Sequence, residues 1–243
     1  MTIRVECPGD AGYLSAIQSY FTRRMDNAEC LLQLTSQKQG NFTYEVLLLC
    51  CCAIDALGNL FLVDDQRDDI PDGKQFRELL WRYGTFKGFD FGLVNAVKLL
   101  QKVQEYERVK GARFPTLITY ISSDIAKHDY PTGNAWKKDL SLGQVKSETE
   151  PLIRSDGHPE LIGWLRSAID KATHAGVLYE QYRCAAVHEM RVGNHWAGSR
   201  DPLPFYMGVI DGGVDFTFPE HYLIPLVRSL LDTLLERCRA SVC

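Results

Sequence analysis

The chain has 243 residues and a mass of 27.6 kDa, enough to bury a substantial core and near the size at which one core gives way to two. Hydrophobic residues make up 45% and charged residues 24%, a composition that excludes disordered and fibrous classes. The formal net charge is -4, so the chain lacks the overall basic field of a strong, non-specific nucleic-acid binder. Any contact with nucleic acid must therefore be local, and we expect a single domain over residues 1–243.

The N-terminal sequence MTIRVECPGD has no basic-then-apolar signal pattern, and no stretch approaches the roughly 18 apolar residues that a membrane span requires. We therefore expect a cytoplasmic protein with no membrane partner. Eight cysteines would suggest a disulfide framework in a short secreted chain, but in this chain we expect free thiols. The three adjacent cysteines at 50–52 are expected to act as small buried apolar residues.

Helical periodicity dominates the first half of the chain. Apolar residues recur at three- and four-residue steps over 13–37, which predicts an amphipathic helix or two in tandem. Residues 42–63 are apolar nearly all round and predict a buried central helix. Asp55 and Asn59 share one face of it, where they either line a cleft or make a helix–helix hydrogen bond. The charged segment 64–73 predicts a loop. Further helices are predicted at residues 74–83, 92–109 and 115–127.

The second half mixes helices with less regular segments. Residues 128–157 contain Pro, Gly and Asn with mixed charge, which predicts an irregular insertion. Helical periodicity resumes over 158–186. Two apolar runs flank the Asp-Gly-Gly turn at 211–213, which predicts one β-hairpin over 204–218. Pro219 then opens a leucine-rich helix. The predicted fold class is mostly α, a helical bundle with an irregular insertion and one β-hairpin.

One short stretch carries residues suited to phosphate chemistry. In LYEQYRCAAVHEMR, residues 178–191, Arg183 and His188 stand five apart near the end of a predicted helix. Histidine can transfer protons near neutral pH, and arginine offers a forked charge that matches phosphate oxygens. Cleavage of RNA needs a base, an acid and a cation, so these residue types can perform it without a metal. Arg191 and Arg200 are candidates for a local RNA-binding patch, although a solvated surface also explains them.

Several familiar sites lack their required residues. The pair His188-Glu189 begins like a zinc-protease helix, but Val192 stands where the second histidine is needed. No Gly-x-Gly-x-x-Gly run, phosphate-binding loop or Gly-x-Ser-x-Gly elbow is present. The six histidines are scattered along the chain. We therefore expect no metal and no cofactor.

This stretch resembles the HEPN (higher eukaryotes and prokaryotes nucleotide-binding) domains. Looser similarity covers residues 53–57 and the terminal segment that starts at Phe218. The resemblance implies a HEPN-like helical bundle and a metal-independent endoribonuclease acting in defence or toxin–antitoxin biology, with RNA and an antitoxin or regulatory protein as partners. Met190 stands where members silenced by tyrosine adenylylation have a tyrosine, so this control is not expected. The matching residues are Leu178, Tyr179, Tyr182, Arg183, His188 and Glu189.

In this hypothesis His188 transfers protons, Arg183 stabilises the phosphoryl charge, and Glu189 or Asp55 orients one of them. Single-stranded RNA is the expected substrate, because unstacked backbone can adopt the in-line geometry. On an ideal helix the Arg183 and His188 side chains lie about 140° apart. Their convergence on one phosphate needs a bend near residues 185–188 or a second copy of the helix. The resemblance implies the second arrangement, a composite site in a homodimer.

Two alternatives remain open. Cys184 occupies a position that is often Asn, Asp or His in catalytic members, and with the acidic net charge it favours a non-catalytic HEPN-fold module that binds a nucleotide, RNA or a protein partner. A purely structural helical dimer is the other alternative. In a structural role, Arg183 would pair with Glu180 or Glu189 while His188 helps to end the helix.

Overall fold

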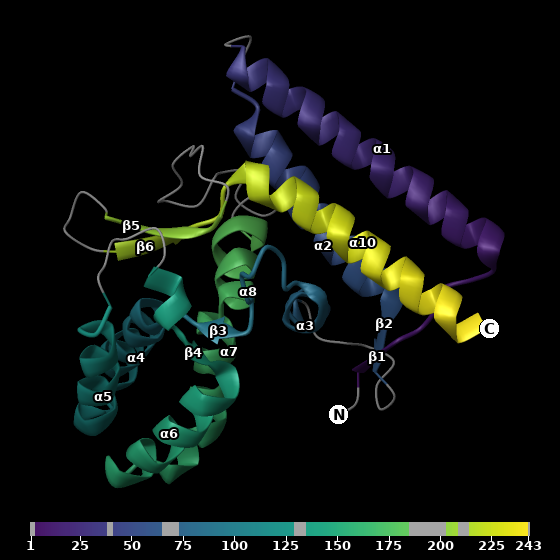
Figure 1. Cartoon of the computed structure of the whole chain (residues 1–243). Helices are drawn as coiled ribbons and strands as arrows, with labels where there is room; N and C mark the ends of the chain where they lie inside the picture. The colour runs from purple at the N-terminus through teal and green to yellow at the C-terminus, as the bar shows by residue number, and fades with distance from the viewer. Residues whose placement is uncertain are drawn as a thin grey trace. The chain divides into compact units, whose positions relative to one another are not determined.

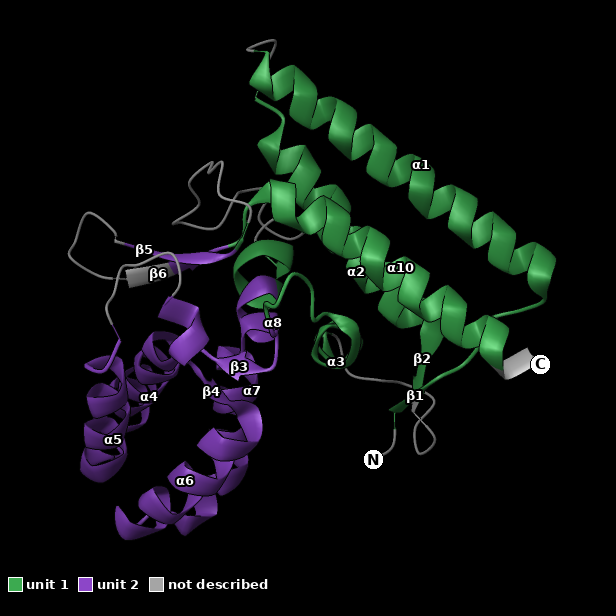
Figure 2. Ribbon diagram, viewed as in Figure 1, with its two compact units in different colours: residues 1–89, 179–203, 218–243 green, residues 90–178, 204–217 purple. Residues whose placement is uncertain are grey.

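A computed structural model of the chain describes residues 3–37, 41–64, 73–128, 135–184, 203–208 and 214–242. The described residues are mostly helical, as predicted. They form two compact units (Figure 2). Unit 1 contains residues 1–89, 179–203 and 218–243, and unit 2 contains residues 90–178 and 204–217. Each unit has buried apolar residues of its own, so each is described by itself.

Unit 1 is built on three long helices that contact one another and lie side by side in Figure 1: α1, α2 and α10. Helix α3 packs on α2, and the antiparallel pair β1–β2 joins the N-terminal segment to the end of α2. These helices confirm those predicted at 13–37, 42–63 and 74–83 and after Pro219. The elements are β1 (Ile3–Val5), α1 (Ala11–Ser36), α2 (Thr43–Phe61), β2 (Leu62–Asp64), α3 (Lys74–Tyr83) and α10 (Glu220–Val242).

The sequence accounts for the two N-terminal helices. The Asp10 carboxylate accepts the Tyr13 backbone N–H at 2.9 Å and so caps α1. Helix α1 buries one stripe, whereas α2 contacts α1, α3 and α10 and is buried on several sides. By length and composition α2 could also cross a membrane, and half of its most apolar window is buried within the described structure. A core helix of a bundle has the same properties. The α1 stripe is Leu14, Ile17, Phe21, Met25 and Ala28.

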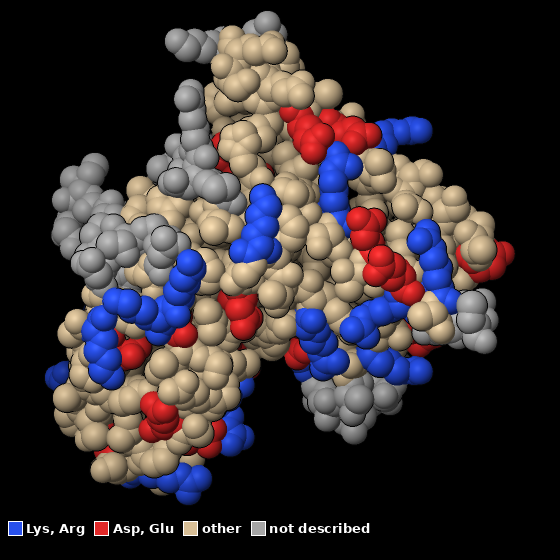
Figure 3. Space-filling model, in the orientation of Figure 1, with Lys and Arg blue, Asp and Glu red and all other residues tan. Residues whose placement is uncertain are grey.

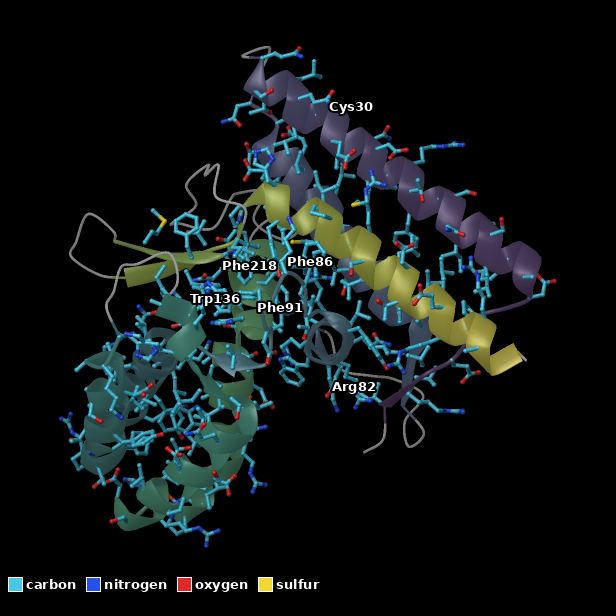
Figure 4. The ribbon with its side chains drawn as sticks, viewed as in Figure 1. Cys30, Arg82, Phe86, Phe91, Trp136 and Phe218 are labelled. Atoms are coloured by element: carbon cyan, nitrogen blue, oxygen red, sulfur yellow. A yellow bond between two sulfur atoms is a disulfide. The ribbon has the colours of Figure 1, made fainter. Side chains whose placement is uncertain are left out.

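Cys7 and Cys238 form a disulfide that links the segment after β1 to α10, with the two Cα atoms 5.3 Å apart. The prediction of free thiols is therefore wrong for this pair. Their separation of 231 residues gives no local spacing from which the pairing could have been inferred. Cys243 lies outside the described residues. The other described cysteines are free, and Cys30 is exposed on α1 (Figure 4). Cys50 and Cys51 are buried as expected, but Cys52 is exposed, so the expectation of burial is wrong for it.

Unit 2 is a smaller helical unit in which α4 contacts α5 and α7, and α6 contacts the same two helices. Its core includes buried leucine, isoleucine, valine and phenylalanine side chains from all four. Short strands β3 and β4 pair antiparallel. The elements are β3 (Leu93–Val94), α4 (Ala96–Lys110), α5 (Pro115–Ile125), η1 (Ala135–Lys138), β4 (Leu140–Ser141), α6 (Leu142–Ser155), η2 (Pro159–Leu161), α7 (Ile162–Ala172), α8 (His174–Val177), β5 (Phe205–Gly208) and β6 (Val214–Thr217).

The prediction of an irregular insertion over 128–157 is wrong for residues 142–155, which form helix α6. Ser141 caps this helix by accepting the Gln144 backbone N–H at 3.3 Å. Val145, Thr149 and Ile153 recur every four residues and form its buried stripe. Polar neighbours and an internal proline, Pro151, hide this stripe in the sequence. Residues 129–134 lie outside the described ranges.

The remaining predictions for unit 2 hold with small shifts of boundary. Helix α4 starts at Ala96, four residues after the predicted start, because Asn95 caps it by accepting the Lys98 backbone N–H. Strands β5 and β6 pair antiparallel, with Phe205 opposite Thr217, and this confirms the predicted hairpin. Its predicted turn at 211–213 lies outside the described residues.

Candidate functional site

The structure brings together two of the four predicted catalytic residues. Arg183 Nη2 donates to Asp55 Oδ2 at 2.8 Å, although the two residues are 128 positions apart in the sequence. Their side chains are 18% and 22% exposed, so the ion pair is half-buried and still reaches solvent. Asp55 comes from the middle of α2, and Arg183 comes from η3 (Leu178–Cys184). Asp55 is thus one carboxylate beside Arg183, and Glu189, a partner in the structural alternative, lies outside the described residues.

An aromatic ring also lies against the Arg183 guanidinium. The guanidinium carbon lies 5.4 Å from the centre of the Tyr179 ring, a cation–π contact. The same ring meets Phe76 edge to face at 5.4 Å. Gly73 packs directly on Tyr179: it has φ of +73°, and a Cβ there would clash with the ring. Tyr179 belongs to the sequence pattern, but its contacts with Gly73 and Arg183 were not predicted.

The charges at this site follow from burial and pairing. Burial lowers the pKa of the Arg183 guanidinium, but the hydrogen bond and charge of Asp55 outweigh it, so this pKa is raised. Burial raises the pKa of the neighbouring Cys51 thiol and of the Tyr179 phenol. At neutral pH the site therefore presents a charged guanidinium beside a neutral thiol and a neutral phenol. Among these groups only the guanidinium offers positive charge to an anion.

The helix that carries Arg183 is not an ideal α-helix. Residues 178–184 form a π-helical segment. Such segments are rare in proteins, and those that occur are frequently at functional sites. The separation of about 140° between Arg183 and His188, derived for ideal α geometry, therefore does not apply here without change. The Tyr182 hydroxyl accepts the Phe218 backbone N–H at 3.2 Å, and the two rings meet edge to face at 5.6 Å. These contacts tie η3 to the segment before α10, where Phe218 is labelled in Figure 4.

Four predicted site residues lie outside the described part of the chain: His188, Glu189, Arg191 and Arg200. Their relation to Arg183 remains a prediction. Within the described ranges, no group of three or more His, Cys, Asp and Glu side chains is placed to hold a metal ion.

Unit 2 contains a second cluster of titratable groups that the sequence analysis did not single out. Asp139 is fully buried, with Oδ1 3.2 Å from His128 Nε2 and Oδ2 2.8 Å from His174 Nε2. The Tyr206 hydroxyl donates to Oδ2 at 2.6 Å. The His174 ring stacks on Phe216 with centres 4.6 Å apart. The four polar side chains come from separate segments of the chain, so no spacing in the sequence could have revealed them.

Both histidines of this cluster also contact backbone carbonyl oxygens. His128 Nδ1 lies 2.9 Å from the Asp124 carbonyl oxygen, and His174 Nδ1 lies 3.1 Å from the Asp90 carbonyl oxygen. The shared carboxylate and the two carbonyl oxygens hold both imidazoles in place. Since the side chains of His128, Asp139 and His174 are 0–1% exposed, the cluster stabilises the interior and is closed to a substrate.

We expect this cluster to make unit 2 less stable as pH rises above neutrality. Contact with Asp139 raises the pKa of His128, so its stabilisation is complete below the ordinary value of 6.5 and is lost as pH rises through the raised value. Burial raises the pKa of Asp139, but its histidine and tyrosine partners lower it overall, so this contribution is lost only as pH falls below 3.8. Burial also raises the pKa of the nearby Asp124 from its ordinary value of 3.8. This carboxyl therefore affects stability at acid pH rather than above neutrality.

Urea unfolding at pH 6 and pH 9 checks this expectation, with His128→Gln as the matched variant. The wild type should show a lower midpoint at pH 9, and the variant should show a smaller difference between the two pH values. An equal difference in both proteins would assign the pH dependence to other groups.

Comparison of the chain with protein-family models, curated proteins and solved structures finds no match.

Proposed function

We propose that the protein is a metal-independent endoribonuclease of the HEPN type that cleaves single-stranded RNA. The observation that carries this proposal is the ion pair between Asp55 and Arg183. The sequence indicates Asp55 because it is a polar residue within an apolar helix, and it indicates Arg183 because this residue belongs to the Arg-x4-His pattern. Their contact at 2.8 Å supports the proposed division of roles, in which Asp55 orients the arginine.

In this proposal Arg183 stabilises the charge that develops on the phosphoryl group. Asp55 and the Tyr179 ring hold the guanidinium in one orientation, so little reorganisation is needed when a phosphate approaches. The partial exposure of Arg183 leaves a route for that approach. Arginine suits this task because its planar fork matches two phosphate oxygens.

His188 performs the proton transfers in this proposal. A base takes the proton of the 2′-hydroxyl as its oxygen attacks phosphorus, and an acid protonates the departing 5′-oxygen. The products are a 2′,3′-cyclic phosphate and a 5′-hydroxyl end. Glu189 is a second candidate to orient the site, and Arg191 and Arg200 contact RNA. The proposal includes a homodimer with a composite site, a cytoplasmic location, and a role in defence or toxin–antitoxin biology with an antitoxin or regulatory protein as partner.

End-group analysis of RNA products tests this chemistry. We expect cleavage of single-stranded RNA to continue in EDTA and to leave 2′,3′-cyclic phosphate and 5′-hydroxyl ends, because a 2′-oxygen nucleophile needs only proton transfer and charge stabilisation. A substrate with 2′-O-methyl groups should resist cleavage. Products with 5′-phosphate ends, formed only when a divalent ion is added, would contradict the proposal.

A binding module that does not cleave RNA is the second candidate. The contact between Asp55 and Arg183 also favours it, because the carboxylate neutralises part of the charge that a phosphate would otherwise meet. Cys184 also favours this candidate, because catalytic members often have Asn, Asp or His at its position. Binding of RNA without any product in the assay above would select this candidate.

A further inference from the structure

A cavity of about 290 Å³ lies in unit 2, lined by side chains of helices α4 and α7. It shares no residue with the Arg183 site. Lys102, Tyr106 and Val109 on α4 recur at steps of four and three residues, so they lie on one face of that helix. Trp164 and Lys171 stand seven residues apart on α7, which also places them on one face. Each helix therefore turns an aromatic ring and a lysine toward the same space.

The two rings that line the cavity pack face against face. The centres of the Tyr106 and Trp164 rings are 4.0 Å apart, with an angle of 36° between the planes. Trp164 also stacks on Phe114, which is fully buried, at 5.6 Å and 14°. Because Phe114 belongs to the core, the stack is held from the interior side. Tyr106 and Trp164 are only partly buried, so part of each ring remains accessible to a ligand.

The cavity has a positive balance in a chain whose net charge is negative. Lys102, Lys110 and Lys171 line it with Glu105 as the single acidic residue. Lys102 and Lys110 are eight residues apart on α4, about 12 Å along the helix axis, so positive charge lies on both sides of the Tyr106 position. On the face shown in Figure 3, basic and acidic side chains are interspersed. The lysines of this cavity thus provide a local concentration of positive charge.

We propose that this cavity binds one nucleotide of single-stranded RNA. The base extends the stack of Tyr106 and Trp164, and the lysines contact the flanking phosphates. Aromatic platforms bordered by positive charge are the arrangement with which proteins hold unpaired nucleic-acid strands. An acidic peptide would use the lysines but has no planar base for the rings, and the volume suits a single nucleotide. The proposal rests on the proposed function for the identity of the ligand, but the binding needs neither Arg183 nor His188.

Binding of a fluorescent 2′-O-methyl octaadenylate, followed by anisotropy at several salt concentrations, tests this proposal on the full chain. The 2′-O-methyl groups block attack by the 2′-oxygen, so binding is measured without cleavage. We expect Trp164→Leu to weaken binding about tenfold and Trp164→Phe to retain most of it. The double variant Lys102→Gln/Lys110→Gln should weaken binding at least tenfold and reduce the salt slope by about 1.4. Lys127→Gln, which removes one positive charge from an exposed lysine outside the cavity, should stay within twofold.

Thermal melting of each variant confirms that it is folded before its affinity is compared. Unchanged binding in both the folded Trp164→Leu variant and the double lysine variant would overturn the proposal, as would equal weakening by Lys127→Gln. Binding of AMP as tight as that of the octamer, with the same dependence on Trp164, would assign the cavity to a free nucleotide instead. If the wild type binds as expected but cleaves no RNA, the nuclease proposal fails and this one stands. If it cleaves RNA while the cavity variants bind normally, only this one fails.

Discussion

Replacing Arg183 with alanine is expected to abolish RNA cleavage while leaving the protein folded. The guanidinium supplies the charge that stabilises the transition state, and loss of such a group typically costs about 3 kcal/mol or more, a decrease in rate of over a hundredfold. The stability cost should be smaller than the loss of a partner from a fully buried pair, because the pair that Arg183 forms with Asp55 is partly exposed. Single-turnover cleavage rates and thermal melting of the same protein measure the two effects.

Three variants serve as controls for this result. Arg183→Lys keeps the charge but loses the planar fork, so it should retain only part of the activity. Asp55→Asn should lower the rate less than Arg183→Ala, because Asp55 positions the arginine and does not touch the substrate. Leu178→Ala should instead reduce stability by about 2–5 kcal/mol, since Leu178 is fully buried. If Arg183→Ala unfolds the protein or cleaves RNA at the wild-type rate, the arginine is not catalytic.

Mixing two inactive variants tests the composite dimer. If each site takes Arg183 from one protomer and His188 from the other, a heterodimer of Arg183→Ala and His188→Ala contains one intact site. Mixed and re-equilibrated samples should then recover activity that neither variant has alone. No recovery, in a mixture shown to contain heterodimers, would place both residues in one protomer.

Replacing Asp139 with alanine is expected to unfold or strongly destabilise unit 2. The substitution leaves His128, His174 and the Tyr206 hydroxyl buried without the carboxylate they share. Removing one partner from a buried ionic group typically costs about 3–5 kcal/mol, because the remaining polar groups stay desolvated. Urea unfolding, combined with hydrogen exchange of backbone amides in residues 90–178, measures the size and the location of the effect.

Glu150→Ala is the matched control for Asp139→Ala. Glu150 is also a carboxylate of unit 2 in an ion pair, with Arg166 at 2.6 Å, but the arginine is largely exposed. Its loss should cost under about 1 kcal/mol. Equal unfolding midpoints for the two variants would show that the buried cluster does not stabilise unit 2.

The helices could be predicted where one apolar stripe faces one core. Helix α3 runs over Lys74–Tyr83 as predicted, and α1 buries the stripe that its periodicity indicates. Helix α6 was missed because Pro151 and the polar residues around it suggested a loop, whereas its buried stripe has only three members. The grouping of the helices into two compact units could not be predicted, because periodicity identifies the buried face of a helix but not the neighbour that covers it.

The candidate site could be predicted only where a residue conflicts with its local surroundings or belongs to a short motif. Asp55 was identifiable because a carboxylate within an apolar helix needs a partner, and Arg183 because of the motif. The Gly73 contact with Tyr179 and the Asp139 cluster arise from residues far apart in the sequence, as does the disulfide between Cys7 and Cys238. Such contacts depend on tertiary packing, which cannot be inferred from local patterns of residues along the chain.

Cleavage of single-stranded RNA in EDTA by the wild type and by His188→Ala tests the central claim most directly. Both proteins are compared under single-turnover conditions, after melting curves have shown that each is folded. The proposed function predicts cleavage by the wild type and a loss of more than a hundredfold in the variant, because histidine carries the proton transfers. Wild-type protein that leaves the RNA intact, or a His188→Ala variant that cleaves at the wild-type rate, would contradict it.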